Sequence, residues 1–207
     1  MASDSMFVRL WPMIARNEPA QLTALRRDNL AHLSGRILEV GAGVGTNFPL
    51  YPSEVTEVIA LEPEAALRRQ AQAEASATAT GPRIEVRPER LDEYRGEPFD
   101  AVVLSLVLCS LPEPADAIAQ VRRLVKSGGD VRFLEHVAAS GGLLERVQKT
   151  VDATFWPRLF GNCHNHRDAV GLVQSGGLTV TSVDSRMLAP RWVPLPTAPV
   201  VLGRAIA

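Results

Sequence analysis

Short apolar runs alternate along the chain with stretches in which apolar residues recur at helical spacing. The runs have the lengths of strands, and the stretches have the lengths of helices. Residues 99–106 are the clearest run, because after Asp100 they carry no polar face, as expected for a strand covered on both sides. The expected strands are residues 36–41, 57–62, 83–87, 99–106, 130–136, 178–185 and 198–207.

Helical patterns fill the intervals between these strands. Residues 63–75 begin with a proline, whose missing N–H costs nothing at a helix start. Residues 114–126 place their apolar side chains on one face and are expected to stop at residues 127–129. A further helix is expected within residues 17–35, ending at Gly35. This alternation predicts an α/β fold, a mostly parallel sheet with helices on both faces.

Two segments do not belong to this scaffold. Residues 1–35 precede the first strand, and residues 141–176 separate the fifth strand from the sixth. Ligands of open α/β sheets bind beyond the carboxyl ends of the strands. We therefore expect a single domain, residues 1–207, in which residues 1–35 form a helical lid and residues 141–176 a helical insert that lines the substrate pocket.

Composition and charge exclude several classes of protein. The formal net charge is -1 and the basic residues are scattered, which argues against nucleic-acid binding. Two cysteines, Cys109 and Cys163, form no disulfide framework, so we expect a cytoplasmic protein. The longest apolar run, residues 101–111, is far shorter than the ~20 residues of a membrane span. The first residues lack the pattern of a signal peptide.

The first expected strand ends in a glycine-rich loop, "LEVGAGVGTN". Its glycines, Gly41, Gly43 and Gly45, follow the pattern G-x-G-x-G, and the sixth position, where the dinucleotide fingerprint has a third glycine, is Thr46. Glu39 precedes the loop, and Glu62 lies 21 positions after Gly41, where a carboxylate reaches two ribose hydroxyls. This combination favours S-adenosylmethionine (SAM) over NAD and over a purely structural turn.

Longer stretches of the chain resemble a known family. "LEVGAGVGTN", "LEP", "FDAVVLSLVLCSLPEP" and "VRRLVKSGGDVRFLEH" are similar to successive motifs of class I SAM-dependent methyltransferases. "GTNFPLYP", "LVLCSL", "EHVAA" and "GNCHNHRD" resemble the methyltransferase-like seven branch, whose characterised members methylate alkyl thiols. The resemblance implies a Rossmann-like, seven-stranded sheet whose last strand is antiparallel. It also implies SAM as cofactor.

The same resemblance implies roles for single residues. The methionine part of SAM would lie along Glu39 and the three loop glycines, Glu62 would hold the ribose, and Glu89 would hold the adenine. Pro88 departs from the pattern of many relatives, because proline has no N–H to offer the adenine. The animal members carry an N-terminal membrane anchor, which we do not expect here, and we expect no membrane span. The further residues implied to contact the cofactor are Asn47, Pro63 and Leu106.

The acceptor pocket is expected beyond the fifth strand. His136 ends that strand and is the first candidate for a general base; alternatively it binds a loop carbonyl and only shapes the pocket. A thiol, with a pKa of ~8.5, needs little help from a base. The candidates for substrate binding are Trp11, Cys109, Trp156, Cys163, His164, His166 and Arg167.

Each of these candidates also has a structural interpretation. Trp11 is expected to pack in the core if it is not in the pocket, and Cys109 to act as a small buried hydrophobe. The stretch "CHNH" lacks the spacing of a structural zinc site, so no metal is expected. It also fits ordinary surface residues at a helix start capped by Asn162 or Asn165, with Arg167 and Asp168 as an ion pair.

These observations predict an enzyme that transfers the methyl group of SAM to a small, hydrophobic acceptor, with a thiol as first choice. The sequence is also compatible with O-, N- or C-methylation of a quinone, phenol or amine lipid. An NAD-binding oxidoreductase and a non-catalytic SAM-binding protein are two further possibilities. The expected partner is a small-molecule methyl acceptor.

Overall fold

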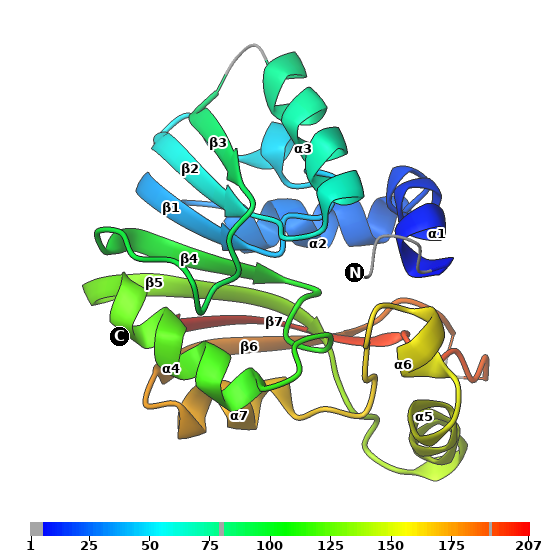
Figure 1. Ribbon diagram of the computed structural model, residues 1–207. Coiled ribbons are helices and arrows are strands. Elements are labelled where there is room, and N and C mark those ends of the chain that lie inside the picture. Colours follow the sequence, from blue (N-terminus) through cyan, green and yellow to red (C-terminus); the bar gives the residue numbers. More distant parts are fainter. Residues whose placement is uncertain (1–5, 79–80, 191) are drawn as a thin grey trace.

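A seven-stranded sheet forms the centre of the molecule in a computed structural model that describes residues 6–78, 81–190 and 192–207 (Figure 1). The strand order is β3-β2-β1-β4-β5-β7-β6. All neighbouring pairs from β3 to β5 are parallel, whereas β7 is antiparallel to both β5 and β6. The strands are β1 (Gly35–Val40), β2 (Val55–Leu61), β3 (Arg83–Arg87), β4 (Phe99–Ser105), β5 (Val125–His136), β6 (Thr179–Met187) and β7 (Pro199–Ile206).

Helices cover both faces of this sheet, as the alternating pattern predicts. The helices are α1 (Met6–Arg16), α2 (Ala20–Leu30), α3 (Ala65–Ala77), α4 (Pro114–Leu124), α5 (Gly142–Ala153), α6 (Trp156–Leu159) and α7 (Ala169–Ser175), with a short 3₁₀ turn η1 (Phe48–Leu50). The predicted fold, a mostly parallel Rossmann-like sheet with an antiparallel last strand, is confirmed.

Strand β4 shows how the sequence divides the core into two layers. Val102 and Leu104 pack into the apolar cluster that includes α4 and α7, whereas Ala101 and Val103 pack into the cluster on the opposite face, which includes residues of α2 and α3. Successive side chains of a strand point to opposite faces, so a strand without a polar face is buried between two layers. The apolar run of β4 therefore explains why this strand lies in the middle of the sheet.

The boundary between α4 and β5 differs from the prediction. The helix ends at Leu124 and β5 starts at once at Val125, instead of after the glycines at residues 127–129. The register with β4 shifts between Phe99 and Ala101, and Gly128 has a φ of +73°. The glycines therefore form an irregularity inside a long strand, not a turn before a short one.

The N-terminal segment contains two helices, and the second ends earlier than expected. Helix α2 stops at Leu30, because Ala31 is extended and His32 has a φ of +64°. Gly35 is the first residue of β1 rather than the helix stop. A Cβ atom at Gly35 would lie 2.4 Å from Asp100 Oδ2, so glycine is required there by the close approach of β4.

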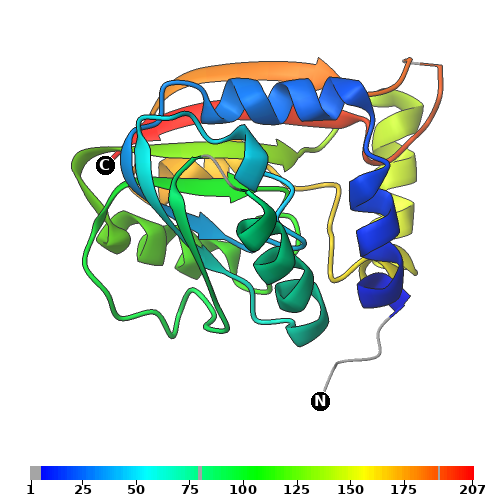
Figure 2. The same cartoon turned by 90° about the horizontal axis from the view of Figure 1, so that it is seen from above.

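The insert between β5 and β6 also divides differently from the prediction. Helix α7 packs against α4 and β6, so it belongs to the layer that covers the sheet. Helices α5 and α6 and the loop that follows them lie beyond one end of the sheet, and α1 lies beyond the same end (Figure 2). Of the helices in the described residues, none has the length and apolar character to cross a bilayer.

Candidate active site

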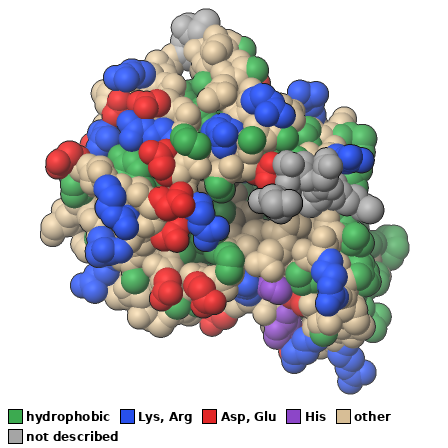
Figure 3. All heavy atoms as spheres, viewed as in Figure 1, with side chains coloured by type: hydrophobic (Ala, Val, Ile, Leu, Met, Phe, Trp, Pro, Cys, Tyr) green, Lys and Arg blue, Asp and Glu red, His purple; other side chains and the backbone are tan. Residues whose placement is uncertain are grey.

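A cavity of about 1250 Å³ opens at the carboxyl ends of the parallel strands. It lies where the strand order reverses between β1 and β4, the usual ligand position in such sheets. A hollow is visible near the middle of the face shown in Figure 3. Because pockets for a single small ligand measure roughly 300–1,000 Å³, this cavity has room for two reactants. Helix α1 and residues of the insert form its outer wall.

The glycine loop after β1 forms one wall of the cavity. Gly41 and Gly43 line it with φ angles of +68° and +61°. A Cβ atom would lie 2.5 Å from Val107 Cγ2 at Gly41 and 3.1 Å from Trp11 Nε1 at Gly43, so the bare backbone is needed at both positions. This wall lets a ligand approach the main chain closely.

The third glycine of the motif has another role. Gly45 is not among the residues that line the cavity, contrary to the expectation that it contacts the cofactor. A Cβ atom there would lie 2.7 Å from the Phe48 ring and 3.1 Å from Glu74 Cβ on α3. The glycine allows the loop, η1 and α3 to pack closely, which is the packing role of a glycine between strand and helix.

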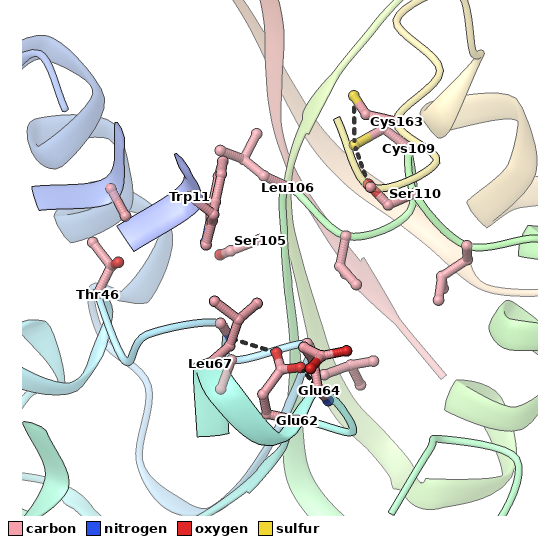
Figure 4. Close-up of a pocket in the computed structure, with 18 of the residues that line it drawn as sticks. Trp11, Thr46, Glu62, Glu64, Leu67, Ser105, Leu106, Cys109, Ser110 and Cys163 are labelled. Atoms are coloured by element: carbon pink, nitrogen blue, oxygen red, sulfur yellow. Dashed lines mark hydrogen bonds between the residues drawn. The ribbon is translucent and has the colours of Figure 1, made fainter. Parts of the chain in front are cut away.

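Glu62 directly follows β2 and projects its carboxylate into the cavity (Figure 4). The carboxylate accepts hydrogen bonds from the backbone N–H of Gly43 at 2.8 Å and of Glu64 at 2.9 Å. Burial raises the pKa of Glu62 to about 7, although both backbone hydrogen bonds oppose this shift. A buried carboxylate fixed in this way is suited to accept hydrogen bonds from a ribose diol, as the spacing from Gly41 predicts.

A buried polar network surrounds Glu39 at the amino-acid end of the expected cofactor site. The Glu39 carboxylate accepts hydrogen bonds from Asn47 Nδ2 and the Tyr51 hydroxyl, both at 2.8 Å. Burial raises the pKa of Glu39. Arg26 donates to Asn47 Oδ1 at 3.1 Å and pairs with Glu18 at 3.0 Å. Arg26 and Glu18 line the cavity, yet they lie on α2 or just before it, far from any recognised motif.

Four buried polar atoms of cavity residues have no hydrogen-bond partner among the described residues: Glu89 Oε2, Ser105 Oγ, His136 Nδ1 and Trp156 Nε1. Buried polar groups in folded proteins are normally paired. Unpaired groups around one cavity therefore fit a site that is completed by ligands. The unpaired Glu89 oxygen fits the amino group of an adenine, an arrangement that does not need the N–H that Pro88 lacks.

His136 lies at the end of β5 and contributes to the cavity wall. Burial lowers the pKa of His136 to about 4, although a hydrogen bond with the Thr197 backbone opposes this shift. The imidazole is therefore neutral at pH 7. The structural alternative, a bond to a loop carbonyl, is consistent with the Thr197 contact, while Nδ1 remains without a partner among the described residues.

Glu135, next to His136, fixes the loop that follows β4. Its fully buried carboxylate accepts hydrogen bonds from the backbone N–H of Val107 and Leu108, both at 2.9 Å, and of Cys109 at 3.3 Å. Burial raises the pKa of Glu135 to about 7, against these hydrogen bonds. The sequence offered a signal, since Glu135 belongs to the "EHVAA" stretch, but its role in positioning this loop was not predicted.

Aromatic side chains and two thiols line another part of the cavity. Phe7 stacks on Trp11 with ring centroids 5.3 Å apart, and Trp156 stacks on Phe160 at 4.2 Å. All four line the cavity, and so do the expected contacts Asn47, Pro63, Leu106, Cys109 and Cys163. Figure 4 shows Glu62 and Glu64 on one side, the two cysteines on another, and Trp11, Ser105 and Leu106 on a third. This part of the site is mainly apolar.

His164, His166 and Arg167 are not among the residues that line the cavity. Arg167 donates to the backbone carbonyls of Leu108 and Leu111, and His166 Nε2 lies 3.4 Å from Glu145 Oε1. His166 and Arg167 instead line a separate, shallow depression. The structure therefore places Arg167 behind the pocket wall, where it supports the β4 loop.

The start of α7 also differs from the prediction. Its cap is Asp168, whose carboxylate accepts a hydrogen bond from the Gly171 N–H at 2.9 Å. Asn162 instead donates to the Ser110 carbonyl, and the Asn165 side chain donates to Asp152. Within the part of the chain that the structure describes, no group of three or more His, Cys, Asp and Glu residues is arranged to hold a metal ion.

Comparisons with known proteins find methyltransferases. Residues 38–133 match the family model described as a methyltransferase domain. Thiol S-methyltransferase TMT1B of Rattus norvegicus is 27% identical over 180 residues, which cover 82% of this chain and 70% of that protein. Phosphatidylethanolamine N-methyltransferase of Cereibacter sphaeroides is 30% identical over 130 residues, which cover 61% of this chain and 64% of that protein.

Solved structures share the fold. N-methyltransferase NodS of Bradyrhizobium japonicum, in complex with S-adenosyl-L-homocysteine, has a TM-score of 0.69 at 16% identity, and the match covers 98% of each chain. The matching family model, the methyltransferase relatives and the glycine loop with its acids all lead to one identification. The chain is a SAM-dependent methyltransferase with SAM as its cofactor, and it resembles the thiol S-methyltransferases.

Proposed function

We propose that this methyltransferase acts on a small hydrophobic acceptor and that the acceptor atom is the sulfur of a thiol. The observation that carries the proposal is the state of His136, the histidine in the cavity wall. Its imidazole is neutral, and its pKa of about 4 makes it a weak base. The surrounding wall is aromatic and apolar, which favours an uncharged, hydrophobic molecule.

The protein's main contribution to this reaction is orientation. SAM, when bound, supplies a methyl group on a sulfonium, which a nucleophile attacks in line. The glycine loop and Glu62 hold one reactant, and the aromatic side chains of α1 and α6 enclose the other. Well-oriented reactants reach effective molarities of roughly 10⁵–10⁸ M, so positioning alone lowers much of the barrier. The enclosing aromatic residues also exclude water from the site.

The pKa of the acceptor group then distinguishes the candidate substrates. A thiol has a pKa of ~8.5 and is partly ionised near neutral pH. Transfer of its proton to an imidazole with a pKa of about 4 is uphill by a few pKa units, while an alcohol has a far higher pKa and would require a much stronger base. A site with such a weak base therefore suits an acceptor that ionises in water.

The relatives support this proposal and also a second candidate. Several are thiol S-methyltransferases, among them the TMT1B protein. The phosphatidylethanolamine N-methyltransferase favours methylation of an amine lipid as the second candidate, because a neutral amine also attacks without a strong base. The apolar cavity wall is compatible with both kinds of acceptor.

A comparison of methylation rates with a set of matched acceptors, each tested separately, tests the proposal. The enzyme is incubated with labelled SAM and with benzyl mercaptan, benzyl alcohol, phenol, benzylamine or phosphatidylethanolamine vesicles, each at the same concentration. We expect label in the thioether and at least a hundredfold less in the alcohol. Glu62→Ala serves as the background, since it weakens cofactor binding. Label found only in phenol or amine products would refute the thiol and favour O- or N-methylation.

A further inference from the structure

Two thiols face each other in the cavity wall. Cys109 lies in the loop after β4 and Cys163 in the loop after α6, 54 positions apart, yet their Sγ atoms are 3.6 Å apart (Figure 4). They are the two cysteines of the chain, and both line the cavity. The His164 N–H donates to the Cys109 carbonyl at 2.8 Å, so the two loops are also joined through their backbones. The pair is thus held at the surface of the acceptor space.

The distance is close to that required for a covalent bond. A disulfide has an S–S length of about 2.0 Å, so the sulfur atoms need to approach by roughly 1.6 Å. Both cysteines lie in loops, where side-chain rotation and small backbone shifts provide such a movement. Ser110 Oγ lies 3.6 Å from Cys109 Sγ, and Asn165 Oδ1 lies 3.9 Å from Cys163 Sγ. The Glu135 carboxylate is the ionisable neighbour: it interacts with the Cys109 thiol and accepts a hydrogen bond from the Cys109 N–H at 3.3 Å.

Methyl transfer from SAM needs neither thiol, because the acceptor attacks the methyl group directly. The contact with Cys163, together with burial, raises the pKa of the Cys109 thiol, which therefore keeps its proton near neutral pH. The pair accordingly stays reduced until a reagent enters the cavity and reacts with one of the two thiols. Both residues are buried, and Cys163 is the more accessible of the two, with 8% of the residue exposed against 3% for Cys109.

We propose that Cys109 and Cys163 form a redox-active dithiol that reduces small, uncharged organic disulfides entering the acceptor cavity. This activity goes beyond methyl transfer and does not depend on which acceptor is methylated. The ligand class follows from the site, because the wall around the pair is apolar and aromatic and the reaction requires a sulfur electrophile that fits inside. A dithiol, unlike a single cysteine, releases the product without an external thiol.

The reaction balances with the groups that are present. Cys163 Sγ loses its proton to solvent and attacks one sulfur of the disulfide RSSR; a Cys163–SR bond forms, and the first RS⁻ leaves and takes up a proton. Cys109 Sγ then loses its proton and attacks Cys163 Sγ, which expels the second RS⁻. The net reaction is RSSR plus two protein thiols giving two RSH plus the Cys109–Cys163 disulfide. The organic disulfide is reduced by two electrons, and the protein is oxidised by two.

The test uses the full-length reduced protein without SAM. It is incubated with 2-hydroxyethyl disulfide, and free thiols, released 2-mercaptoethanol and intact mass are followed with time. We expect two protein thiols to disappear, two molecules of 2-mercaptoethanol to be released and the protein mass to fall by two hydrogen atoms. A non-reducing digest is expected to contain the peptide joined through Cys109 and Cys163. Persistence of both thiols, or a stable mixed disulfide in the wild-type protein, would overturn the proposal.

Two comparisons test the order of steps and the route through the cavity. Cys109→Ser is expected to stop at the mixed disulfide on Cys163, and Cys163→Ser to react at least tenfold more slowly than the wild-type protein. Glutathione disulfide, which is larger and charged, is expected to oxidise the pair at least tenfold more slowly than 2-hydroxyethyl disulfide. Equal rates for the two reagents would show that oxidation does not proceed through the cavity. If the serine variants do not fold, the wild-type mass and product measurements decide the result.

Discussion

The two halves of the active site are built in different ways. The cofactor half consists of backbone and acids that are already fixed by hydrogen bonds: Glu62 binds two backbone N–H groups, and Glu39 binds Asn47 and Tyr51. The acceptor half consists of aromatic rings, thiols and an imidazole whose Nδ1 has no partner among the described residues. One half is a rigid polar frame, and the other is an apolar enclosure.

This difference follows from the chemistry of the two ligands. SAM always presents the same ribose, adenine and amino-acid groups, so fixed donors and acceptors can recognise it. A hydrophobic acceptor has few polar groups, and its binding depends on shape and on the area removed from water. Substitutions in the two halves are therefore expected to change different quantities. Cofactor affinity should respond to the frame, and turnover with the acceptor should respond to the enclosure.

The largest expected effect is on the frame. Glu62→Ala is expected to remove two hydrogen bonds that we propose between this carboxylate and the ribose, each worth roughly 1.5–3 kcal/mol when one partner is charged. We expect the dissociation constant for SAM to rise at least tenfold in calorimetry, while the protein still unfolds cooperatively. The control is Glu54→Ala, which changes an exposed acid directly before the start of β2. Unchanged SAM binding in Glu62→Ala would remove this residue from the cofactor site.

A smaller effect is expected in the enclosure. His136→Ala should lower the rate of thiol methylation by less than ~100-fold, the low end of the usual general-base contribution. Much of the loss should be recovered at higher pH, because solvent then generates the thiolate. The SAM dissociation constant should stay within about twofold. His164→Ala, which replaces a histidine outside the cavity lining, is the matched control. A loss far above ~100-fold at every pH would show that the imidazole is essential.

The ionisation of Glu62 gives a further difference between the halves. Its pKa is about 7 in the cofactor-free protein, and donors from a ribose favour the ionised carboxylate. SAM affinity should therefore be constant well above pH 7 and weaken as the pH falls through 7, by at most ~10-fold per pH unit for one linked proton. Glu62→Gln should remove this dependence, while titration of the ligand itself affects both proteins equally. Calorimetry from pH 5.5 to 8.5 measures the slope.

The smallest effect is expected for metal removal. Purified protein should contain no stoichiometric zinc, and a chelator should leave methyl transfer unchanged within about twofold. His166→Ala should likewise change the rate little, since this side chain lies outside the cavity lining and faces Glu145. One tightly held equivalent of zinc in elemental analysis would contradict this expectation.

The sequence predicted the frame better than the enclosure, for a physical reason. Gly41, Gly43 and Glu62 lie at fixed offsets on consecutive strand ends, so spacing along the chain reports spacing in the fold. Gly45 shows the limit of this reasoning, because it does not line the cavity and its lack of a side chain is required by packing against Phe48 and α3. The central strands β1, β2 and β4 were predicted well because burial on both faces leaves a continuous apolar pattern.

The enclosure comes from segments that are far apart in sequence and have no fixed spacing. Arg26 and Glu18 reach the cavity only because α2 lies across the sheet, and no local pattern reports that placement. Arg167 and His166 have the residue types of a polar pocket wall, yet the chain direction after Cys163 carries them behind it. Residue type alone could not show which side chains of this loop face the cavity and which lie behind its wall.

Helix α1 touches both halves of the site. Trp11 lies against Gly43 of the cofactor loop, and Phe7 lies against Gly161, next to the acceptor space. Whichever ligand binds first is expected to hold α1 in place. The second ligand then meets a preformed wall, and its binding costs less conformational entropy. By thermodynamic linkage, SAM must then increase the affinity for the acceptor by the same factor by which the acceptor increases the affinity for SAM. We therefore expect the two reactants to bind cooperatively through their shared contacts with this helix.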